Sequence, residues 1–192
     1  MSETSWQIWA ERADDERGVD AVIRAAFAEQ GAKVAALWDD VRSARLWHDG
    51  YVAVEGDRVV GHVGLSHAWL DARARLVDIA LLSPLSVVPD RQRTGIGGLL
   101  LRTAVEAALR RSPVLALEGD PGYYAARGFV AAGDHGIVPP SDRIPAAACQ
   151  VVLGHDHEPW MTGRIVYPEV WWRHDAVGLR APLLEQVEQR HG

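Results

Sequence analysis

A strand–turn–helix pattern between residues 75 and 111 limits the folds that this sequence can adopt. Residues 75–88 are mostly apolar on both faces, as in a central strand. The polar, glycine-rich residues 90–98 follow, and residues 99–111 then place apolar side chains at helical spacing. This connection directs backbone N–H groups and the positive end of a helix dipole to one point, so it predicts a site for an anion such as a phosphate.

Three familiar motifs do not match this segment. The dinucleotide fingerprint G-x-G-x-x-G has Leu100 where its third glycine belongs, and the Walker A pattern lacks its Gly-Lys-Ser/Thr. A G-x-S-x-G nucleophile elbow is also absent from the sequence. What is left is Gln92-Arg93-Thr94-Gly95-Ile96-Gly97. Taken alone, this segment could be a plain connection between a strand and a helix.

The remaining elements follow from hydrophobic periodicity and turn signals. Strands are predicted over 6–11, 51–55, 58–70, 75–88, 114–118, 129–132 and 149–153. Helices are predicted over 14–27, 32–46, 99–111 and 120–128, with a closing helix over 179–190. Pro84 interrupts the strand over 75–88, because proline offers no N–H to a ladder. We therefore expect a bulge near Pro84, or a strand that splays from its neighbour there.

Composition excludes several classes of function. The chain has 192 residues, a net charge of −6 and no basic block, which argues against a nucleic-acid partner. The longest apolar stretch, 79–88, is too short for a membrane helix, and residues 1–5 do not resemble a signal peptide. The single cysteine, Cys149, rules out an internal disulfide and is predicted to lie buried in a strand. These features predict a cytoplasmic protein without a membrane partner.

Two segments together carry a resemblance to a known family. Gln92–Gly97, preceded by Leu85-Ser86-Val87-Val88-Pro89, resembles motif A (Q/R-x-x-G-x-G/A) of the GCN5-related N-acetyltransferase (GNAT) superfamily. Residues 119–129, Gly-Asp-Pro-Gly-Tyr-Tyr-Ala-Ala-Arg-Gly-Phe, resemble its second hallmark, a tyrosine followed by three residues and Gly-Phe. The likeness covers roughly Trp6 to Gly154 and looks closest to a bacterial subgroup with a Gly-Asp-Pro-x-Tyr-Tyr motif.

The resemblance implies a fold and a co-substrate. The fold is α/β, with a mixed, mostly antiparallel central sheet flanked by helices and two parallel central strands splayed at a bulge. These strands would be 75–88 and 114–118, and acetyl-CoA would fill the gap between them without a metal ion. The resemblance assigns the pantetheine to the backbone of Ser86, Val87 and Val88. It assigns the pyrophosphate to Arg93, Thr94, Gly95, Ile96, Gly97 and Gly98.

The resemblance also implies a direct attack by an amine on the thioester of acetyl-CoA, within a ternary complex. Tyr124 matches the hallmark tyrosine and is the predicted general acid near the CoA sulfur, its alternative role being that of a packing aromatic. Glu118 ends the predicted strand 114–118, where it could accept a proton directly or through water. Its alternatives are to attract a cationic amine or to face solvent. Asp120 is interpreted mainly as a helix cap.

The distribution of tryptophans along the chain suggests which residues contact the acceptor amine. The chain has eight, and none lies between Asp71 and Pro159, the span that holds the motifs. Trp38, Trp171 and Trp172 are predicted to contact a cationic small-molecule amine, with an aminoglycoside-type antibiotic or amino sugar as the leading acceptor. The alternative for each is the core or a dimer interface. Other hypotheses are acetylation of a protein or peptide amine and a non-catalytic CoA-binding sensor.

The last part of the chain differs in composition. We expect residues 1–154 to form the acetyltransferase domain and residues 155–192 an extension, packed on the same domain or on the partner subunit of a homodimer. Residues 155–158, His-Asp-His-Glu, suggest a metal site at first sight. Without further ligands, a solvated polar turn is the better interpretation.

Overall fold

A computed structural model describes residues 6–44 and 46–186. The chain forms two compact units, which are described separately. The first unit contains residues 1–66 and 82–110, and the second contains residues 67–81 and 111–192. Strands β3 (Arg58–Ala72) and β4 (Leu76–Val87) pass from one unit into the other. Residues 187–190 of the predicted helix over 179–190 lie outside the described residues.

The first unit contains an antiparallel part of the sheet. β1 (Trp6–Ala10) pairs with β2 (His48–Glu55), which pairs with β3 across a turn at Gly56, whose φ is +60°. Ala53 lies opposite Gly61, but Val54 lies opposite Val59, so Val60 is an extra residue in β3. Beyond this bulge, the alternation of side chains between the two faces of β3 is reversed.

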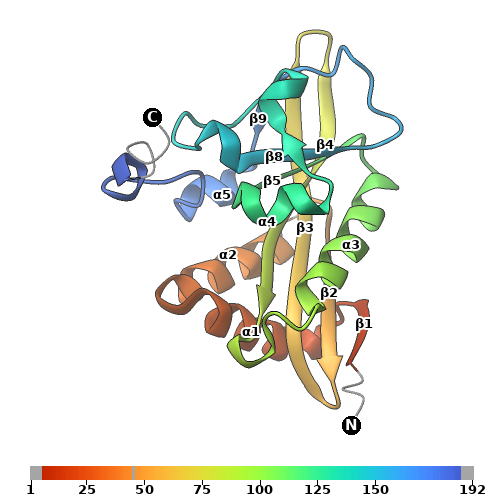
Figure 1. The fold of residues 1–192 in the computed structure, drawn as a ribbon, viewed down its shortest axis with the longest axis vertical. Helices are drawn as coiled ribbons and strands as arrows, with labels where there is room; N and C mark the ends of the chain where they lie inside the picture. The colour runs from red at the N-terminus through yellow and green to blue at the C-terminus, as the bar shows by residue number, and fades with distance from the viewer. Residues whose placement is uncertain (1–5, 45, 187–192) are drawn as a thin grey trace. The chain divides into compact units, whose positions relative to one another are not determined.

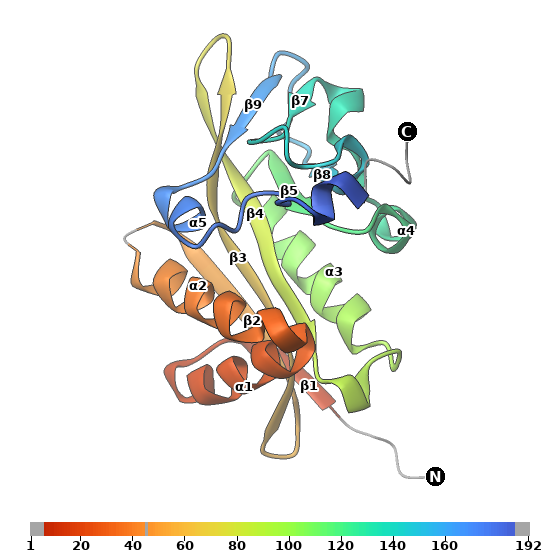
Figure 2. The same ribbon diagram turned by 90° about the vertical axis from the view of Figure 1, so that its left-hand side faces the viewer.

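Helices cover both faces of β3 in the first unit. α1 (Glu16–Phe27) and α2 (Gly31–Ser43) lie side by side (Figures 1 and 2). A side chain at Gly64 would collide with the Trp38 ring of α2, whereas one at Gly61 would meet Leu100 of α3 (Ile96–Leu109) at 2.8 Å. Gly61 and Gly64 are an odd number of residues apart and therefore face opposite sides of the strand, so α2 and α3 pack on opposite faces of β3.

The second unit contains the parallel pair of strands. β4 pairs with β5 (Val114–Glu118) in parallel at two positions, Ala80↔Leu115 and Leu81↔Ala116. The ladder ends there, before Pro84, although β4 continues to Val87. β8 (Cys149–Leu153) runs antiparallel to β5, and β6 (Val130–Ala131) runs antiparallel to β8. The predicted fold class, a mixed and mostly antiparallel sheet flanked by helices, is confirmed.

The hallmark segment of the second unit folds as its residues predict. α4 (Pro121–Tyr124) begins after Asp120, whose Oδ1 accepts a hydrogen bond from the N–H of Gly122 at 2.8 Å. Gly128 ends the following turn of helix with a φ of +89°. Short 3₁₀ helices within residues 6–44 and 46–186 are η1 (Ala13–Asp15), η2 (Ala28–Gln30) and η3 (Pro89–Arg91) in the first unit, and η4 (Ala125–Arg127), η5 (Ala132–His135) and η6 (Ala146–Ala148) in the second.

Two strands and an α-helix of the second unit were not predicted. β9 (Gly163–Val166) pairs antiparallel with Trp69–Ala72 of β3 and parallel with β7 (Ile137–Val138). α5 (Glu169–Arg173) follows and carries Trp171 and Trp172. The predicted extension therefore contributes a strand to the sheet of its own chain, whereas the domain boundary at residue 154 stays a prediction.

Candidate functional site

The glycine-rich turn of the first unit has the geometry of an anion site. Gly95 precedes the first residue of α3 with a φ of +97°, and no side chain caps the helix. The first amides of a helix have no partner within the helix, so those of Ile96, Gly97 and Gly98 are directed away from it. A Cβ atom added at Gly95 or Gly98 would meet nothing within 4 Å. The turn therefore offers N–H groups, a positive dipole end and room for the backbone approach of a pyrophosphate.

Side chains on either side of the turn hold its shape. The Gln92 side-chain amide donates to the carbonyl of Val87 at 3.2 Å, and the Thr94 hydroxyl donates to the carbonyl of Arg91 at 2.6 Å. Arg93 adopts a left-handed φ of +61° and is exposed. Gln92, the first residue of the motif, thus connects the turn to the end of β4, a role that the sequence did not suggest.

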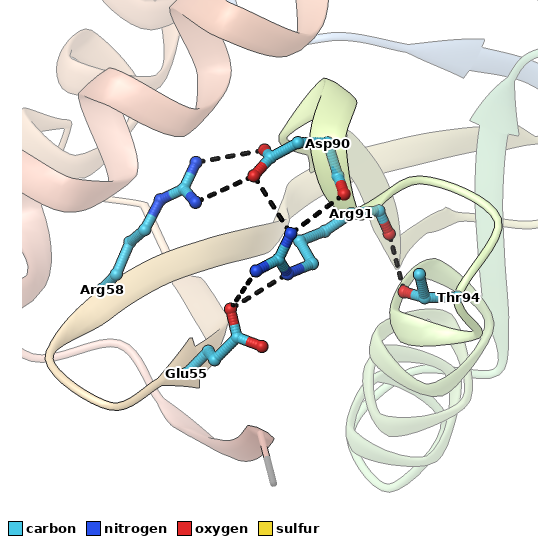
Figure 3. Close-up of polar contacts among 5 residues, drawn as sticks. All are labelled: Glu55, Arg58, Asp90, Arg91 and Thr94. Carbon is cyan, nitrogen blue, oxygen red and sulfur yellow. Dashed lines mark hydrogen bonds and ion pairs between the residues drawn. The ribbon is translucent and has the colours of Figure 1, made fainter. Parts of the chain in front are cut away.

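A network of ion pairs ties the turn to the β2–β3 hairpin (Figure 3). Both terminal nitrogens of Arg58 bond to Asp90, at 3.0 and 3.1 Å, and this guanidinium lowers the pKa of Asp90. Arg91 bonds to Asp90 at 3.1 Å and to Glu55 through its Nε at 2.9 Å. The pairs are partly or largely exposed, so their role is to orient the turn more than to stabilise the fold. Charged residues on the hairpin were the only sequence signal for this network.

The three predicted pantetheine residues differ in their availability. Ser86 is buried, and its hydroxyl donates to the carbonyl of His62 at 3.3 Å. The N–H of Val88 donates to the carbonyl of Val60 at 3.0 Å, and its own carbonyl accepts from Arg91. The N–H of Val88, which the resemblance assigns to the pantetheine, is therefore engaged by the extra residue Val60, and the assignment itself stays a prediction. Val87 is half-buried at the end of β4, and its carbonyl accepts the Gln92 side-chain amide.

Tyr124 lies in the second unit at the end of α4. Its ring packs edge-on against Tyr123 and Phe129, with centroids at 5.0 and 5.5 Å, and directly over Gly119. Its hydroxyl has no hydrogen-bond partner among the described residues. Burial raises the pKa of Tyr124 to about 12, which keeps the hydroxyl protonated at neutral pH. A protonated, unshared hydroxyl can serve as a hydrogen-bond donor or a general acid.

Glu118 ends β5 and is half-buried. Burial raises the pKa of this carboxyl, and hydrogen bonds from the Tyr167 hydroxyl and the Gly178 amide, together with the charge of Arg143, act in the opposite direction. The distance from the Gly178 nitrogen to Glu118 Oε2 is 3.2 Å. A carboxyl group with a raised pKa is a better proton acceptor than an exposed one. The proposed alternative of a Glu118 that faces solvent does not agree with this setting.

Tyr167, Gly178 and Arg143 were not predicted as site residues. Tyr167 is buried, and burial followed by the charge of Glu118 raises its pKa well above the ordinary range. No local sequence pattern links these residues to Glu118, because Gly178 lies 60 positions away from it. Cys149, opposite Glu118 on β8, is buried as predicted, and burial raises the pKa of its thiol to about 12.

Two of the three tryptophans predicted to contact the acceptor are buried, so the prediction was wrong for them. Trp38 is 1% exposed and packs on Gly64 and His62, and Trp171 is 4% exposed beside Tyr167. These two are core residues, because large apolar rings at inward-facing helix positions are buried on folding. Trp172 is 44% exposed, with its ring N–H bonded to the carbonyl of Tyr167 at 3.2 Å.

No helix in residues 6–44 or 46–186 is both long and apolar enough to cross a membrane. Within the same ranges, no group of three or more His, Cys, Asp and Glu side chains is arranged to hold a metal ion.

Comparison with known sequences gives a family match. Residues 46–131 match the model of the acetyltransferase (GNAT) domain family. The protein named "Uncharacterized N-acetyltransferase YjhQ" of Escherichia coli strain K12 is 33% identical over 116 residues. The aligned segment covers 59% of this chain and 63% of that protein, so the chain spans less than two thirds of this relative.

Comparison with solved structures gives the same fold. A GNAT family N-acetyltransferase of E. coli, YhbS, solved in complex with CoA, superposes with a TM-score of 0.81 at 23% identity, covering 94% of this chain and 98% of that one. A GNAT family acetyltransferase of Brucella melitensis, solved with acetyl-CoA, has a TM-score of 0.70 at 27% identity, covering 88% and 99%. The matched family residues include the glycine turn, Glu118 and Tyr124.

Proposed function

We propose that this protein is an acetyl-CoA-dependent N-acetyltransferase that transfers the acetyl group to a primary amine of a small molecule. The observation that carries the proposal is the turn before α3. Its left-handed Gly95, its uncapped amides and the open space at Gly95 and Gly98 suit a pyrophosphate. The family match over residues 46–131 and the CoA or acetyl-CoA held by two similar structures support the same co-substrate.

Acetyl-CoA supplies the thioester carbonyl that the amine attacks. A C–N bond forms, the C–S bond breaks, and the amine loses one proton while the sulfur gains one. Glu118 is assigned to take the amine proton, directly or through water, because its pKa is raised by burial. Tyr124 is assigned to give its hydroxyl proton to the leaving thiolate, because it matches the tyrosine of the second hallmark and its hydroxyl is protonated at neutral pH. Binding of acetyl-CoA and the amine in one ternary complex would make the attack effectively unimolecular.

The predicted acceptor, an aminoglycoside or amino sugar, depended on contacts with Trp38, Trp171 and Trp172. Trp38 and Trp171 are buried, and of these three only Trp172 is exposed enough to contribute. A small amine is retained, with a protein or peptide amine as the second hypothesis and a non-catalytic CoA sensor as the third. A cytoplasmic location and a homodimer stay predictions from the sequence.

Two measurements test this function. Acetyl-CoA is expected to raise the melting temperature of the protein in a concentration-dependent way, since it binds the folded state. No rise would contradict both the enzyme and the sensor. Release of free CoA thiol is then measured over aminoglycosides, polyamines, amino acids and peptides, against a blank without amine. Release above the blank supports the enzyme, whereas a melting shift with no release from any amine supports the sensor.

A further inference from the structure

A groove with a volume of about 620 Å³ lies in the first unit, between α1 and the β2–β3 hairpin. Residues 92–98 of the glycine-rich turn, all of them described, do not line it, and of the residues assigned to acetyl-CoA only Val88 does. Sites for small molecules typically have volumes of about 300–1,000 Å³. The groove is therefore large enough for a small molecule that is not acetyl-CoA.

The groove is open because α1 presents small residues to it. Gly18, Ala21 and Ala25 line the helix side, at a spacing that places them on one face of α1. At Gly18 the helix comes close to β3, since an added Cβ would approach Val59 Cγ2 to 2.5 Å. Ala21 and Ala25 are exposed. A longer side chain at residue 21 would therefore occupy space that is open to a ligand.

The floor of the groove is apolar. Val22, Val54 and Val88 are buried side chains of the floor, and half-buried Val59 lies beside them. Trp9 adds an aromatic ring to the lining. An apolar group of a ligand would gain free energy here, because it would remove its own surface and that of the floor from water.

Two carboxylates of the lining lack a counter-ion. Asp14 and Asp57 are exposed, and the side chain of neither makes an ion pair or hydrogen bond with a residue that the structure describes. The other charged groups of the lining are engaged. Asp15 Oδ2 accepts two N–H groups at 3.0 and 3.1 Å, and both terminal nitrogens of Arg58 bond to Asp90 (Figure 3). The groove therefore attracts a cation and repels an anion.

We propose that this groove is a second ligand site, which binds a small hydrophobic cation: an ammonium group joined to an apolar body. The apolar body lies on the valine floor, and the positive charge lies beside Asp14 and Asp57. Neither part is sufficient alone, because an exposed ion pair contributes little and a neutral molecule is not attracted to the carboxylates. This site goes beyond the proposed acetyl transfer, since it requires neither acetyl-CoA nor the turn at Gly95.

Calorimetric titration with four matched compounds tests the site. 3-Phenylpropyltrimethylammonium has both the cation and the apolar body. Tetramethylammonium lacks the body, 4-phenylbutan-1-ol lacks the charge, and 4-phenylbutyrate reverses it. A quaternary ammonium group has no N–H, so it cannot accept an acetyl group. We expect the first compound to bind at least about tenfold more tightly than each of the other three, and its affinity to fall as the NaCl concentration rises.

Variants locate the binding. Ala21→Leu is expected to fill the groove and weaken the affinity for the cation at least about tenfold, while the fold persists because leucine suits an exposed helix position. The matched control is Ala36→Leu, an exposed position of α2 outside the groove. Asp14→Asn combined with Asp57→Asn should weaken the affinity about tenfold. Glu29→Gln, which removes an exposed carboxylate outside the groove, should not change it.

Four results would overturn the inference. They are no detectable binding of the cation, equal affinity for 4-phenylbutyrate, a loss of affinity in Ala21→Leu no larger than in Ala36→Leu, and a dimer that Ala21→Leu dissociates. Sedimentation of the protein alone measures the last, which would show that a second copy of the chain fills the groove. Release of CoA thiol by the wild-type protein is measured separately, so failure of this inference leaves the proposed function standing.

Discussion

The ring of Tyr124 lies directly over the backbone of Gly119, the residue that follows Glu118. A Cβ atom at Gly119 would overlap Tyr124 Cε2 and would approach Cδ2 to 2.9 Å. Gly119 is also fixed by its neighbours, because its N–H bonds to the carbonyl of Ala148 at 3.0 Å and its carbonyl accepts from Gln150 at 3.3 Å. The missing side chain at residue 119 therefore sets the position of the predicted general acid.

Gly119→Ala is expected to displace the Tyr124 ring and lower turnover, with a loss of about 1–3 kcal/mol of stability from overpacking. Gly133→Ala in the same unit is the control, because a Cβ at Gly133 meets nothing within 4 Å. The measurements are kcat with the best amine and the free energy of unfolding in urea. Unchanged turnover in Gly119→Ala would show that the ring position does not matter.

Tyr124→Phe is expected to lower kcat about a hundredfold while the affinity for acetyl-CoA stays within a factor of two or so. The substitution removes the proton donor and keeps the ring contacts with Tyr123 and Phe129. Tyr123→Phe is the control, since the Tyr123 ring is engaged by Arg127 at 3.7 Å and has no assigned chemical role. A Tyr124→Phe enzyme with normal kcat would leave this tyrosine a packing residue.

Gly98→Ala separates folding from co-substrate binding. The added Cβ meets no atom within 4 Å, and alanine favours a helix over glycine by up to about 1 kcal/mol, so the fold should be as stable or slightly more stable. The same methyl group would crowd a pyrophosphate at the helix terminus, so acetyl-CoA affinity should fall about tenfold. Titration calorimetry measures the affinity for acetyl-CoA, and thermal melting measures the stability of the fold. Gly95→Ala, at a φ of +97°, should by contrast lose stability as well.

Stability is expected to fall as the pH drops below about 6.5. Burial lowers the pKa of His62, so the folded state keeps it neutral while the unfolded chain takes up a proton below its ordinary pKa. Glu11, bonded to His62 Nε2 at 3.0 Å, has a lowered pKa despite burial, and its contribution is lost at still lower pH. Melting temperatures of wild type and His62→Gln between pH 8 and 5 test this, with the exposed His155→Gln as control. If the melting temperature fell equally with pH in wild type and His62→Gln, His62 would not be the cause of the loss of stability.

Much of the local structure could be predicted from short stretches of sequence. Asp120 caps α4 and Gly128 ends the next turn because both act on backbone groups within a few residues. The turn at Gly95 follows from the freedom of glycine at a left-handed φ. The strands β7 and β9 were missed because they are short and exist through pairing with distant residues.

The candidate site shows the same difference between features set by neighbouring residues and features set by residues distant in sequence. The strand–turn–helix that suits a pyrophosphate and the tyrosine of the second hallmark could be predicted from the sequence, because their geometry is set by neighbouring residues. Folding alone places Trp38 and Trp171 in the core and brings Gly178 and Tyr167 into hydrogen-bonding contact with Glu118. Burial and charge pairing are properties of residues brought together by folding, and spacing along the chain does not encode them.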